Sequence, residues 1–522
     1  MTIGKQLRVP FAGLRVYGVV MQITAERPEI NHSTVVRKSD AGGVRGRCED
    51  GICRFLGVPY AAPPVGANRF KEPQPVKPWP GERDATKPGD CAPHRIKDFP
   101  ALDVVPLVGY GRDDGEDYLT LNIWTPEKAE KRPVMVFIHG GGFVIGSKDA
   151  PVHDGTAFAK SGIVCVAINY RLGIDGFLPI PGVPTNLGLR DMLFALQWVQ
   201  RNIAEFGGDP SNVTVFGESA GAMAIANLVA SPLAQGLFKR AIIESGHGSM
   251  VRDMPVAQRL VEKLAKILKI SPDAAGFAGI SFDKAWKAME KVTKPWGVNL
   301  RDENGLEPVF GISRFIPVWG DDVLPQKPVD ALKSGVGKDI EVLIGTNTEE
   351  MNLYFVPTKV RSKAPGWLLN WLLSKSHPRS KDALRAYGWG KSGKKGHVFT
   401  EAMHDLVFRW PARRFAEDHQ GKTHLYDFDW RSPACGGELG ACHGLELPFV
   451  FKTLDLATGP KGFAGDAPPQ ELADRIHGIW VQYATDGTLP WPEFDRDSRQ
   501  VHLLGSDKTV TEPVMPAAQF LS

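Results

Sequence analysis

Three short stretches of the chain are apolar at almost every position, and they constrain the fold more than any other feature of the sequence. They are residues 134–138 (VMVFI), 163–168 (IVCVAI) and 213–216 (VTVF). A strand that is apolar on both faces is typical of a parallel sheet covered on both sides. Between these strands, apolar residues repeat at helical spacing over 192–206, and small residues predict a further helix over 220–230.

The alternation of strands and helices predicts the fold class. Further strands are expected at 340–344 and 425–428. We therefore predict an α/β fold with a large, mainly parallel central sheet flanked by helices. No internal repeat and no clean linker interrupts the 522 residues. We expect one domain over residues 1–522, with mostly helical cap insertions at about 250–335 and 355–425.

The charge balance excludes some classes of partner. Lys and Arg number 62 and Asp and Glu 59, which gives a formal net charge of +3. The chain therefore lacks the overall basic character that nucleic-acid binding requires, and we expect no nucleic-acid partner. No apolar run reaches the ~18 residues that a membrane span needs, so no transmembrane segment is expected. The oligomeric state is left open.

The sequence GESAG at residues 217–221 fits the pattern G-x-S-x-G around Ser219. It lies between the strand expected at 213–216 and the helix expected from Ala220. A sharp turn between a strand and a helix lifts the serine hydroxyl above the sheet, and the helix N-terminus offers N–H groups to a developing oxyanion. We predict that Ser219 is a catalytic nucleophile.

A glycine loop follows the strand at 134–138 directly. Its sequence is HGGGF at residues 139–143. Successive glycines let the backbone approach a ligand closely and aim N–H groups at it. A phosphate-binding loop would end in Lys and Ser or Thr, and neither follows here. We predict an oxyanion hole formed by the N–H groups of Gly141, Gly142 and Ala220, and each well-aimed donor would contribute about 3 kcal/mol.

These motifs lie in stretches that resemble the type-B carboxylesterase/cholinesterase family of α/β-hydrolases, in its bacterial form. The stretch 206–221 (FGGDPSNVTVFGESAG) is similar to the family signature. Other matches, in order, are PPVG…RF at 63–70, EDYLTLNI at 116–123, the glycine loop, and NYRLG…GFL at 169–178. The resemblance covers most of the chain and implies an α/β-hydrolase fold with esterase activity.

The resemblance also supplies the acid and the base. The stretch GTNTEE at 345–350 matches the family's acid loop and makes Glu350 the acid, although Met351 stands where the family usually has Gly and Glu349 is adjacent. The stretch GACHGLELPF at 440–449 makes His443 the base. The order Ser219, Glu350, His443 is the order of α/β-hydrolases.

Supporting roles are implied by the same resemblance. Glu218 and Ser245 are expected in the hydrogen-bond network around the triad. Arg69 and Glu116 resemble the family's structural ion pair.

Family members often have a cysteine where Tyr118 stands, bridged to one that resembles Cys91, so that bridge is absent here. Residues 92–117 contain no Trp, whereas cholinesterases hold a choline-binding Trp in this loop, so we do not expect choline-ester specificity.

The six cysteines are too few for a disulfide scaffold. Cys48 with Cys53, or Cys435 with Cys442, could bridge locally, but we interpret all six as mostly structural free thiols, and we assign no metal to the cysteines before His443.

Near the N-terminus, Lys5, Arg8 and Arg15 precede an apolar stretch at 16–21 that is too short for a signal peptide. We predict a cytoplasmic location, with a secreted or periplasmic one as the alternative.

One insertion is strongly basic. Between Lys359 and Lys395 there are ten Lys and Arg and a single acid, Asp382, around the apolar cluster WLLNWLL at 367–373. We interpret this segment as a cap helix packed over a cleft. A lid that contacts lipid or attracts anionic substrates is the alternative. Leu353, Tyr354 and Phe355 are expected to line the cleft together with the aromatic residues of this cap.

The sequence thus predicts a serine carboxylesterase that hydrolyses short-to-medium acyl or aryl esters through a Ser-His-Glu triad and an acyl-enzyme. The expected partner is a small-molecule ester, and no metal or organic cofactor is expected. An amidase or carbamate hydrolase with the same triad is the alternative within hydrolases. A non-catalytic, cholinesterase-like binding module is the alternative from another class, and the intact triad argues against it.

Overall fold

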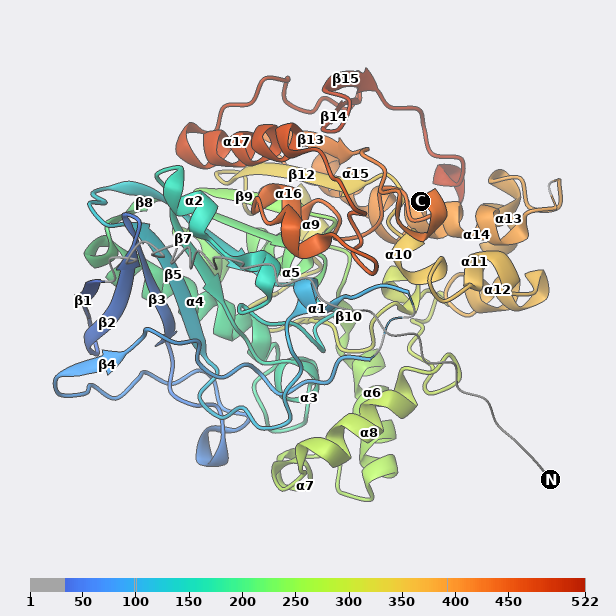
Figure 1. The fold of residues 1–522 in the computed structure, drawn as a ribbon. Coiled ribbons are helices and arrows are strands. Elements are labelled where there is room, and N and C mark those ends of the chain that lie inside the picture. The colour runs from blue at the N-terminus through green and yellow to red at the C-terminus, as the bar shows by residue number, and fades with distance from the viewer. Residues whose placement is uncertain (1–32, 98, 100, 392, 522) are drawn as a thin grey trace, which may run out of the picture.

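The computed structural model describes residues 33–521, apart from residues 98, 100 and 392. The apolar stretch at 16–21 and the basic residues before it lie outside the described residues. In the described part, a 13-stranded sheet runs through the molecule in the order β1-β2-β3-β5-β7-β6-β8-β9-β12-β13-β14-β15, with β4 beside β2. Figure 1 shows this sheet between two layers of helices. The fold is that of an α/β-hydrolase, as the sequence predicts.

The strands of the main sheet and of the small β10–β11 pair are short. Their bounds are β1 Ser33–Ser39, β2 Gly42–Glu49, β3 Ile52–Pro59, β4 Glu82–Asp84, β5 Thr120–Pro126, β6 Arg132–Ile138, β7 Val164–Ile168, β8 Gly208–Glu218, β9 Arg240–Glu244, β10 Arg252–Asp253, β11 Val318–Trp319, β12 Glu341–Asn347, β13 Thr423–Phe428, β14 Gln500–Leu503 and β15 Lys508–Thr511.

The helices vary more in length. Their bounds are α1 Val105–Val108, α2 Thr156–Lys160, α3 Gly173–Phe177, α4 Leu187–Asn202, α5 Ala220–Val229, α6 Met254–Leu268, α7 Ala274–Ala278, α8 Phe282–Val292, α9 Pro328–Lys333, α10 Asn352–Phe355, α11 Val360–Lys363, α12 Gly366–Ser374, α13 Ser380–Ala386, α14 Lys395–His404, α15 Trp410–Asp418, α16 Leu447–Val450 and α17 Gln470–Asp486. A π-helical segment, Asp405–Arg409, lies between α14 and α15.

The central strands are buried on both faces, which explains their unbroken apolar sequences. Along β6, Val134, Val136 and Ile138 belong to one hydrophobic core, whereas Met135 and Phe137 belong to a second core on the opposite face. Helices α4, α5 and α15 contribute to the first core, and α2, α16 and α17 to the second. From β7 through β6, β8, β9, β12, β13 to β14 all neighbours are parallel. Because these strands are parallel, their carboxyl ends all lie along the same edge of the sheet.

The first insertion is only partly helical, which corrects the expectation for residues 250–335. Helices α6, α7 and α8 fill its first half. Residues 293–327 contain little regular structure beyond the two-residue strand β11 and a short 3₁₀ turn at 308–311. Proline and glycine are frequent there, which is why a helical pattern does not continue.

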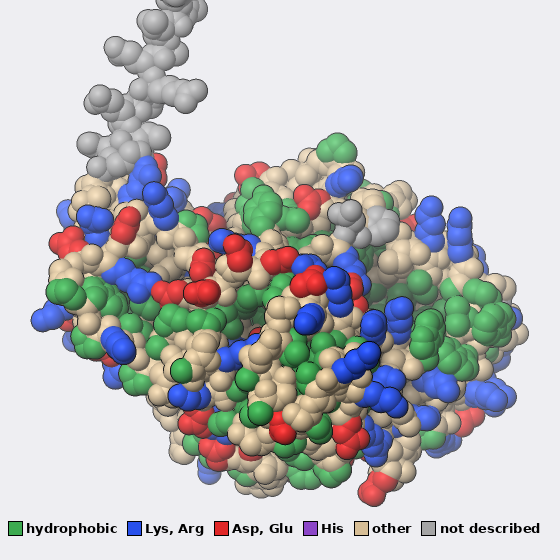
Figure 2. All heavy atoms as spheres, turned by 90° about the horizontal axis from the view of Figure 1, so that it is seen from below, with side chains coloured by type: hydrophobic (Ala, Val, Ile, Leu, Met, Phe, Trp, Pro, Cys, Tyr) green, Lys and Arg blue, Asp and Glu red, His purple; other side chains and the backbone are tan. Residues whose placement is uncertain are grey.

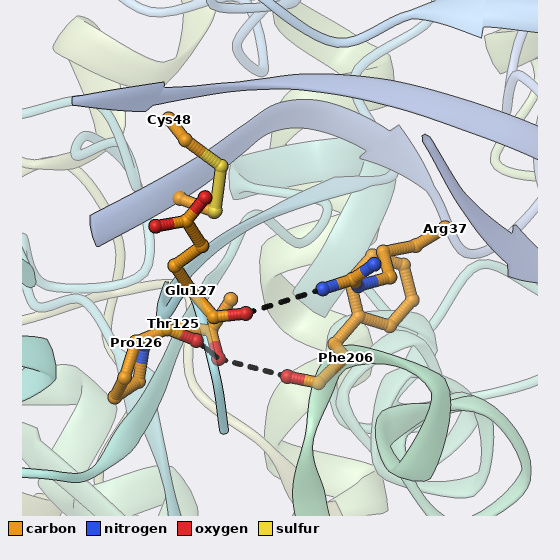
Figure 3. The surroundings of a disulfide bond; sticks show 7 residues. Arg37, Cys48, Thr125, Pro126, Glu127 and Phe206 are labelled. Atoms are coloured by element: carbon orange, nitrogen blue, oxygen red, sulfur yellow. Dashed lines mark hydrogen bonds between the residues drawn. A yellow bond between two sulfur atoms is a disulfide. The ribbon is translucent and has the colours of Figure 1, made fainter. Parts of the chain in front are cut away.

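A disulfide joins Cys48 on β2 to Cys53 on β3, so the interpretation of all six cysteines as free thiols is wrong for this pair. The two residues face each other in the antiparallel pairing of the β2–β3 hairpin, which brings the two sulfurs together. Figure 3 shows the disulfide near the end of β5, where the Thr125 hydroxyl donates to Phe206 O at 2.8 Å and Arg37 donates to Glu127 O at 3.4 Å. The other four cysteines are free, Cys435 and Cys442 among them.

The expected ion pair between Arg69 and Glu116 does not form. Arg69 Nε instead donates to Asp175 Oδ1 at 2.8 Å. Glu116 is exposed, and its backbone N–H donates to Asp90. The Arg69 guanidinium also donates to the carbonyl oxygens of Ala278, at the end of α7, and of Ile280, so it ties the loop at 63–70 to the first insertion.

Candidate active site

Ser219 occupies a sharp turn between β8 and α5. Its backbone angles are φ 56° and ψ −123°, which a non-glycine residue rarely adopts. The turn packs directly against the end of β6, because a Cβ atom at Gly217 or Gly221 would lie within 2.4 or 2.0 Å of Ile138 O. The Ser219 N–H donates to Glu244 O at 2.9 Å, which fixes the turn to β9. These two glycines are therefore required by the close contact with β6.

The structure brings Ser219, His443 and Glu350 together from three distant parts of the chain. His443 Nε2 lies 2.8 Å from Ser219 Oγ, and His443 Nδ1 lies 2.6 Å from Glu350 Oε2. Glu350 is fully buried and His443 nearly so. The carboxylate accepts a hydrogen bond from the Nδ1–H group. Nε2 is therefore left to accept a proton from the serine hydroxyl.

The loops that carry Glu350 and His443 are locked to each other by Asn347. Its backbone N–H donates to Glu350 Oε1 at 2.8 Å. Its side-chain amide donates to Cys442 O at 2.7 Å and to the Glu446 carboxylate. In return, the His443 N–H donates to Glu350 O at 3.2 Å. Sequence reasoning did not single out Asn347 or Glu446, although both stand inside the two stretches that carry the family resemblance.

Glu349, the neighbour of Glu350, faces away from the imidazole. Its carboxylate accepts hydrogen bonds from Arg431 at 2.5 Å and from the Ala441 N–H at 3.0 Å. It also accepts a bond from the Asn352 amide at 3.2 Å. Glu349 therefore braces the loop before His443, whereas Glu350 contacts the imidazole ring itself.

The electrostatics of the site are dominated by buried carboxylates around His443. Burial by itself lowers the pKa of His443, but the negative charges of Glu218, Glu350 and Glu446 outweigh it and raise that pKa to about 9. Burial raises the pKa of Glu218 to about 7, opposed by His443 and supported by Glu350. Burial, with Glu218 and Glu350, raises the pKa of Glu446 to about 8.

Glu218 acts on His443 through charge rather than through a hydrogen bond. Its Oε1 lies 3.0 Å from His443 Nε2, yet this oxygen has no hydrogen-bond partner among the described residues. Ser219 Oγ is the hydrogen-bond partner of Nε2. A protonated imidazole at this position is therefore stabilised from both sides, by Glu350 at Nδ1 and by Glu218 near Nε2.

The glycine loop after β6 is held in one conformation because every carbonyl from residue 139 to residue 143 accepts a hydrogen bond. The donors are the Tyr170 hydroxyl to His139 O (2.8 Å), His139 Nδ1 to Gly140 O (2.9 Å), the N–H groups of Val144 and Ile145 to Gly141 O (3.1 Å each), the Ser313 hydroxyl to Gly142 O (2.8 Å) and the Gly173 N–H to Phe143 O (2.7 Å).

The N–H groups of this loop are in the opposite situation. In the described part of the chain, no turn or loop hydrogen bond uses the N–H of Gly141, Gly142 or Ala220. Gly141 and Gly142 have φ of 109° and 62°, values that favour glycine. A loop whose carbonyls are all satisfied and whose N–H groups are free can donate to an anionic oxygen above Ser219. Ser313 was not foreseen, because nothing in the sequence links residue 313 to the glycine loop.

Above Ser219 lies a cavity of about 390 Å³. Leu353 and Tyr354 line it, as expected from the sequence, but Phe355 is not among the lining residues, and its ring packs against Phe399 at 5.5 Å. The other large apolar side chains that line it are Ile96, Phe99, Val104, Leu107, Val108, Val144, Ile145, Met223, Met250, Trp286, Met289, Ile312 and Phe408.

Phe408 is a further residue that sequence reasoning missed. Its ring centroid lies 4.7 Å from that of His443, and Tyr354 lies at 5.6 Å on the same imidazole. Phe408 belongs to the π-helical segment, and such segments often occur at functional sites. The two rings limit the orientations that the imidazole can take.

The interpretation of residues 359–395 as the cover of the cleft is wrong. None of the described residues of this segment lines the cavity. Residues 95–97, 99, 104, 107 and 108 line it instead, together with α8, and ion pairs join Arg95 and Lys97 to that helix. Arg95 pairs with Asp113 at 2.6 Å and with Asp283 on α8 at 3.1 Å, and Lys97 pairs with Glu290 on α8 at 2.9 Å.

Ser245, expected near the triad, contributes through its backbone. Its N–H donates to Gly345 O at 2.9 Å, which links the turn after β9 to β12. Its hydroxyl is buried and has no hydrogen-bond partner in the described part of the molecule. The preceding residue, Glu244, accepts a bond from Trp480 Nε1 at 3.0 Å, and burial raises the pKa of this carboxyl.

The sheet, the turn at Ser219 and the acid and base loops after β12 and β13 define the class: an α/β-hydrolase. Residues 32–518 match the model of the carboxylesterase family, and the chain belongs to that family. It is similar to the para-nitrobenzyl esterase of Bacillus subtilis (strain 168), with 35% identity over 90% of this chain and 94% of the relative. It is also similar to the phenmedipham hydrolase of Pseudarthrobacter oxydans, with 32% identity over 90% of this chain and 95% of the relative.

Solved structures show the same relationship. A structure of PNB esterase superposes with a TM-score of 0.80 at 32% identity, covering 94% of this chain and all of that chain. A thermophilic PNB esterase superposes with a TM-score of 0.81 at 31% identity, again over 94% of this chain and all of the other. The chain is a carboxylic ester hydrolase, and this sets aside the non-catalytic binding module.

Proposed function

We propose that this enzyme is a serine carboxylesterase that cleaves short-to-medium acyl or aryl esters through an acyl-enzyme intermediate. The observation that carries the proposal is the continuous chain of contacts from Ser219 Oγ to His443 Nε2 at 2.8 Å and from Nδ1 to Glu350 at 2.6 Å. This chain ends beneath a mostly apolar cavity that admits a small ester.

In the first half of the reaction, Ser219 Oγ attacks the carbonyl carbon of the ester while His443 Nε2 takes the hydroxyl proton. The Glu350 carboxylate stabilises the imidazolium. The carbonyl oxygen becomes an oxyanion that accepts hydrogen bonds from the N–H groups of Gly141, Gly142 and Ala220, each worth about 3 kcal/mol when well aimed. When the tetrahedral intermediate collapses, the bond to the alcohol oxygen breaks and His443 donates the proton to that oxygen.

The second half repeats these steps with water. His443 Nε2 takes a proton from water, whose oxygen attacks the acyl carbon on Ser219 Oγ. The same N–H groups stabilise the second oxyanion. Collapse breaks the bond to Oγ, the serine recovers its proton from His443, and the carboxylic acid leaves. Every step uses protein groups, the ester and water.

The size and lining of the cavity support the substrate class. About 390 Å³ accommodates a small acyl or aryl group but not a long extended chain. Met223, Met250 and Met289 line it together with Trp286 and Phe408, so apolar groups are favoured on both sides of the ester. The name of the Bacillus relative, an esterase of a para-nitrobenzyl ester, agrees with an aryl-accepting site.

The test is hydrolysis of p-nitrophenyl acetate, butyrate, octanoate and palmitate by the wild type and by Ser219→Ala. We expect the highest kcat/KM for acetate or butyrate, and a fall of several orders of magnitude in Ser219→Ala with an unchanged melting temperature. An organophosphate should label the wild type at Ser219 and leave the variant unlabelled. A preference for palmitate would refute the substrate class, and full activity in Ser219→Ala would refute the site.

We further propose that the chain acts as one catalytic domain with two insertions, of which the first contributes most of the insertion residues around the active site. Most insertion residues that line the cavity, such as Trp286, Met289 and Ile312, belong to residues 250–335, and Phe408 is the contribution of the second insertion. The second insertion starts directly after the acid loop, yet its basic part at 359–395 contributes no lining residue.

A further inference from the structure

Helices α11–α14 form a basic surface that the proposed ester hydrolysis does not use. They span most of the segment from Lys359 to Lys395, which has ten Lys and Arg against one acid. In Figure 1 these helices lie at one end of the molecule, beyond α10 and away from β1–β4. Figure 2 shows that the same end carries an apolar patch with Lys and Arg side chains around it.

The lysines of this surface are exposed and lack acidic partners. Within the described residues no carboxylate oxygen lies within 4.0 Å of their ammonium groups, whereas Arg379 and Arg385 share the one acid, Asp382, at 3.4 Å each. The lysines in question are Lys359, Lys363, Lys375, Lys381, Lys391, Lys394 and Lys395. Seven unneutralised positive charges on one small group of helices produce a local positive potential, although the chain as a whole is nearly neutral.

Helix α12 adds an apolar face to this charge. Its inner face is formed by Leu369 and Leu373, which are buried. Trp367 and Trp371 are one helical turn apart on the opposite face, and the Trp367 side chain is 72% exposed. Lys375 follows one turn later, with its ammonium 5.2 Å from the centroid of the Trp371 ring.

We propose that α12 and the lysines around it form a docking surface for an anionic lipid bilayer. Indole rings concentrate at the boundary between lipid headgroups and acyl chains, and lysine stems extend along apolar surface so that the ammonium reaches the anionic headgroups. A short helix with tryptophans outward and lysines at its flanks satisfies both requirements at once. Nucleic acid would use the charge but not the adjacent leucines, Leu368 and Leu372, so lipid is the partner that the surface fits best.

Docking through this surface leaves the catalytic cavity free, because no residue of 359–395 lines it. The enzyme would be held at a membrane by one end of the molecule while the active site remains open. This inference does not depend on the proposed function, because lipid binding is measured without turnover.

The experiment is co-sedimentation of the full chain with vesicles of phosphatidylcholine alone or mixed with phosphatidylglycerol. We expect binding only to the anionic vesicles, and weaker binding as salt rises from about 0.1 M to about 0.5 M, because screening shortens the range of the attraction. Trp367→Ala and the pair Lys363→Glu with Lys375→Glu should each weaken binding about tenfold or more. Turnover of soluble p-nitrophenyl acetate should stay unchanged in these variants.

The chain offers a matched control for each change. Trp296 is 74% exposed but lies outside the basic segment, so Trp296→Ala should leave vesicle binding unchanged. Lys128 and Lys131 are exposed in the turn between β5 and β6, and changing both to Glu alters the net charge as much as the test pair does. These controls separate a local docking surface from general charge attraction.

Two results would overturn the proposal. The first is an absence of binding to phosphatidylglycerol vesicles beyond that to phosphatidylcholine. The second is binding that Lys128→Glu with Lys131→Glu weakens as much as Lys363→Glu with Lys375→Glu, or that Trp367→Ala leaves intact. If the Lys128 and Lys131 pair weakens binding as much, the attraction is one of general charge, and a DNA duplex should compete with the vesicles equally well.

Discussion

Ser219 and its neighbours hold strained or crowded backbone positions that only a tightly packed surrounding can maintain. The φ of 56° at Ser219 is accompanied by a φ of 55° at Ser245, one strand further along the sheet. Gly246 is equally constrained, because a Cβ atom there would lie 2.4 Å from the Ala222 Cβ at the start of α5. Strain of this kind is typical of active sites, where it keeps the nucleophile in an orientation that a relaxed turn would not allow.

At the residue scale, the two adjacent acids should differ sharply in function. We expect Glu350→Gln to lower kcat by about a thousandfold or more, because the neutral amide no longer stabilises the imidazolium and leaves the wrong tautomer accessible. Glu349→Gln should lower kcat by much less, since Glu349 contacts Arg431 and Ala441 rather than the ring. Kinetics on p-nitrophenyl butyrate measure both. The reverse ranking would show that Glu349 is the acid.

Glu218 should set the lower limit of the pH range for activity. Its negative charge raises the pKa of His443, and the reaction requires a neutral His443. Glu218→Gln removes that charge, so the pKa of His443 falls and the acidic limb of the kcat/KM profile should move to lower pH by about one unit.

The control for this shift is Glu290→Gln, which changes a carboxylate at the mouth of the same cavity. Glu290 pairs with Lys97 and does not act on the pKa of His443, so its replacement should leave the acidic limb in place. A Glu218→Gln profile that shifts to higher pH, or not at all, would contradict the electrostatic role of Glu218.

At the element scale, one side chain of the first insertion is hydrogen-bonded to the glycine loop after β6. Ser313, in the irregular segment after α8, donates its hydroxyl to Gly142 O at 2.8 Å and also contacts Phe315 O at 3.3 Å. The remaining donors to the glycine loop belong to that loop itself or to residues 170–173 at the end of β7. The position of the insertion and the orientation of the N–H groups proposed to bind the oxyanion are therefore coupled.

Removal of this hydroxyl should affect the chemical step more than substrate binding. We expect Ser313→Ala to lower kcat about three- to tenfold with little change in KM, since one hydrogen bond that orients the loop is lost. Ser313→Thr keeps a hydroxyl and should retain most of kcat. If Ser313→Ala changed KM alone, Ser313 would act only as a wall of the cavity.

The second insertion shows how an element can be predicted correctly as local structure and wrongly as packing. Its helical segments form, with α12 at Gly366–Ser374 over the tryptophan and leucine cluster. Its place in the molecule could not be derived, because a short amphipathic helix carries no information about which surface it covers. The ion pairs between residues 95–97 and α8, which do form the cover, join parts of the chain about 190 residues apart.

At the scale of the whole molecule, few covalent crosslinks stabilise the fold. Between residues 33 and 521, in the part that the structure describes, no helix has both the length and the apolar composition needed to cross a membrane. One disulfide, Cys48–Cys53, closes a hairpin at the edge of the sheet. A disulfide of this kind is typical of proteins in oxidising compartments. The cytoplasmic location remains an untested prediction, and the Cys48–Cys53 pair argues against it.

Thiol titration tests this pair directly. The denatured protein should show four reactive thiols before reduction and six after it, since four cysteines are free and the sequence contains six. Reduction should lower the free energy of unfolding by about 2 kcal/mol, because the crosslink closes a short loop in the unfolded chain. The Cys53→Ser variant should be insensitive to reductant. Six thiols in the unreduced protein would show that the pair is open.

The sequence by itself determined the parts of this protein that depend on local pattern and on motif. The nearly unbroken apolar runs predicted the central strands β6, β7 and β8, because a strand buried on both faces favours apolar residues at almost every position. The stretches around Ser219, Glu350 and His443 predicted the family and the candidate triad, because each motif is compact enough to be recognised on its own.

The tertiary structure alone decided the contacts between segments that are distant in the chain. Arg69 pairs with Asp175 instead of Glu116, Ser313 holds Gly142, and Phe408 packs on His443. Each of these side chains has several chemically suitable partners in the sequence, and only the packing of loops against the sheet selects one of them. Motif and periodicity are local properties, whereas the walls of a cavity are a property of the whole fold.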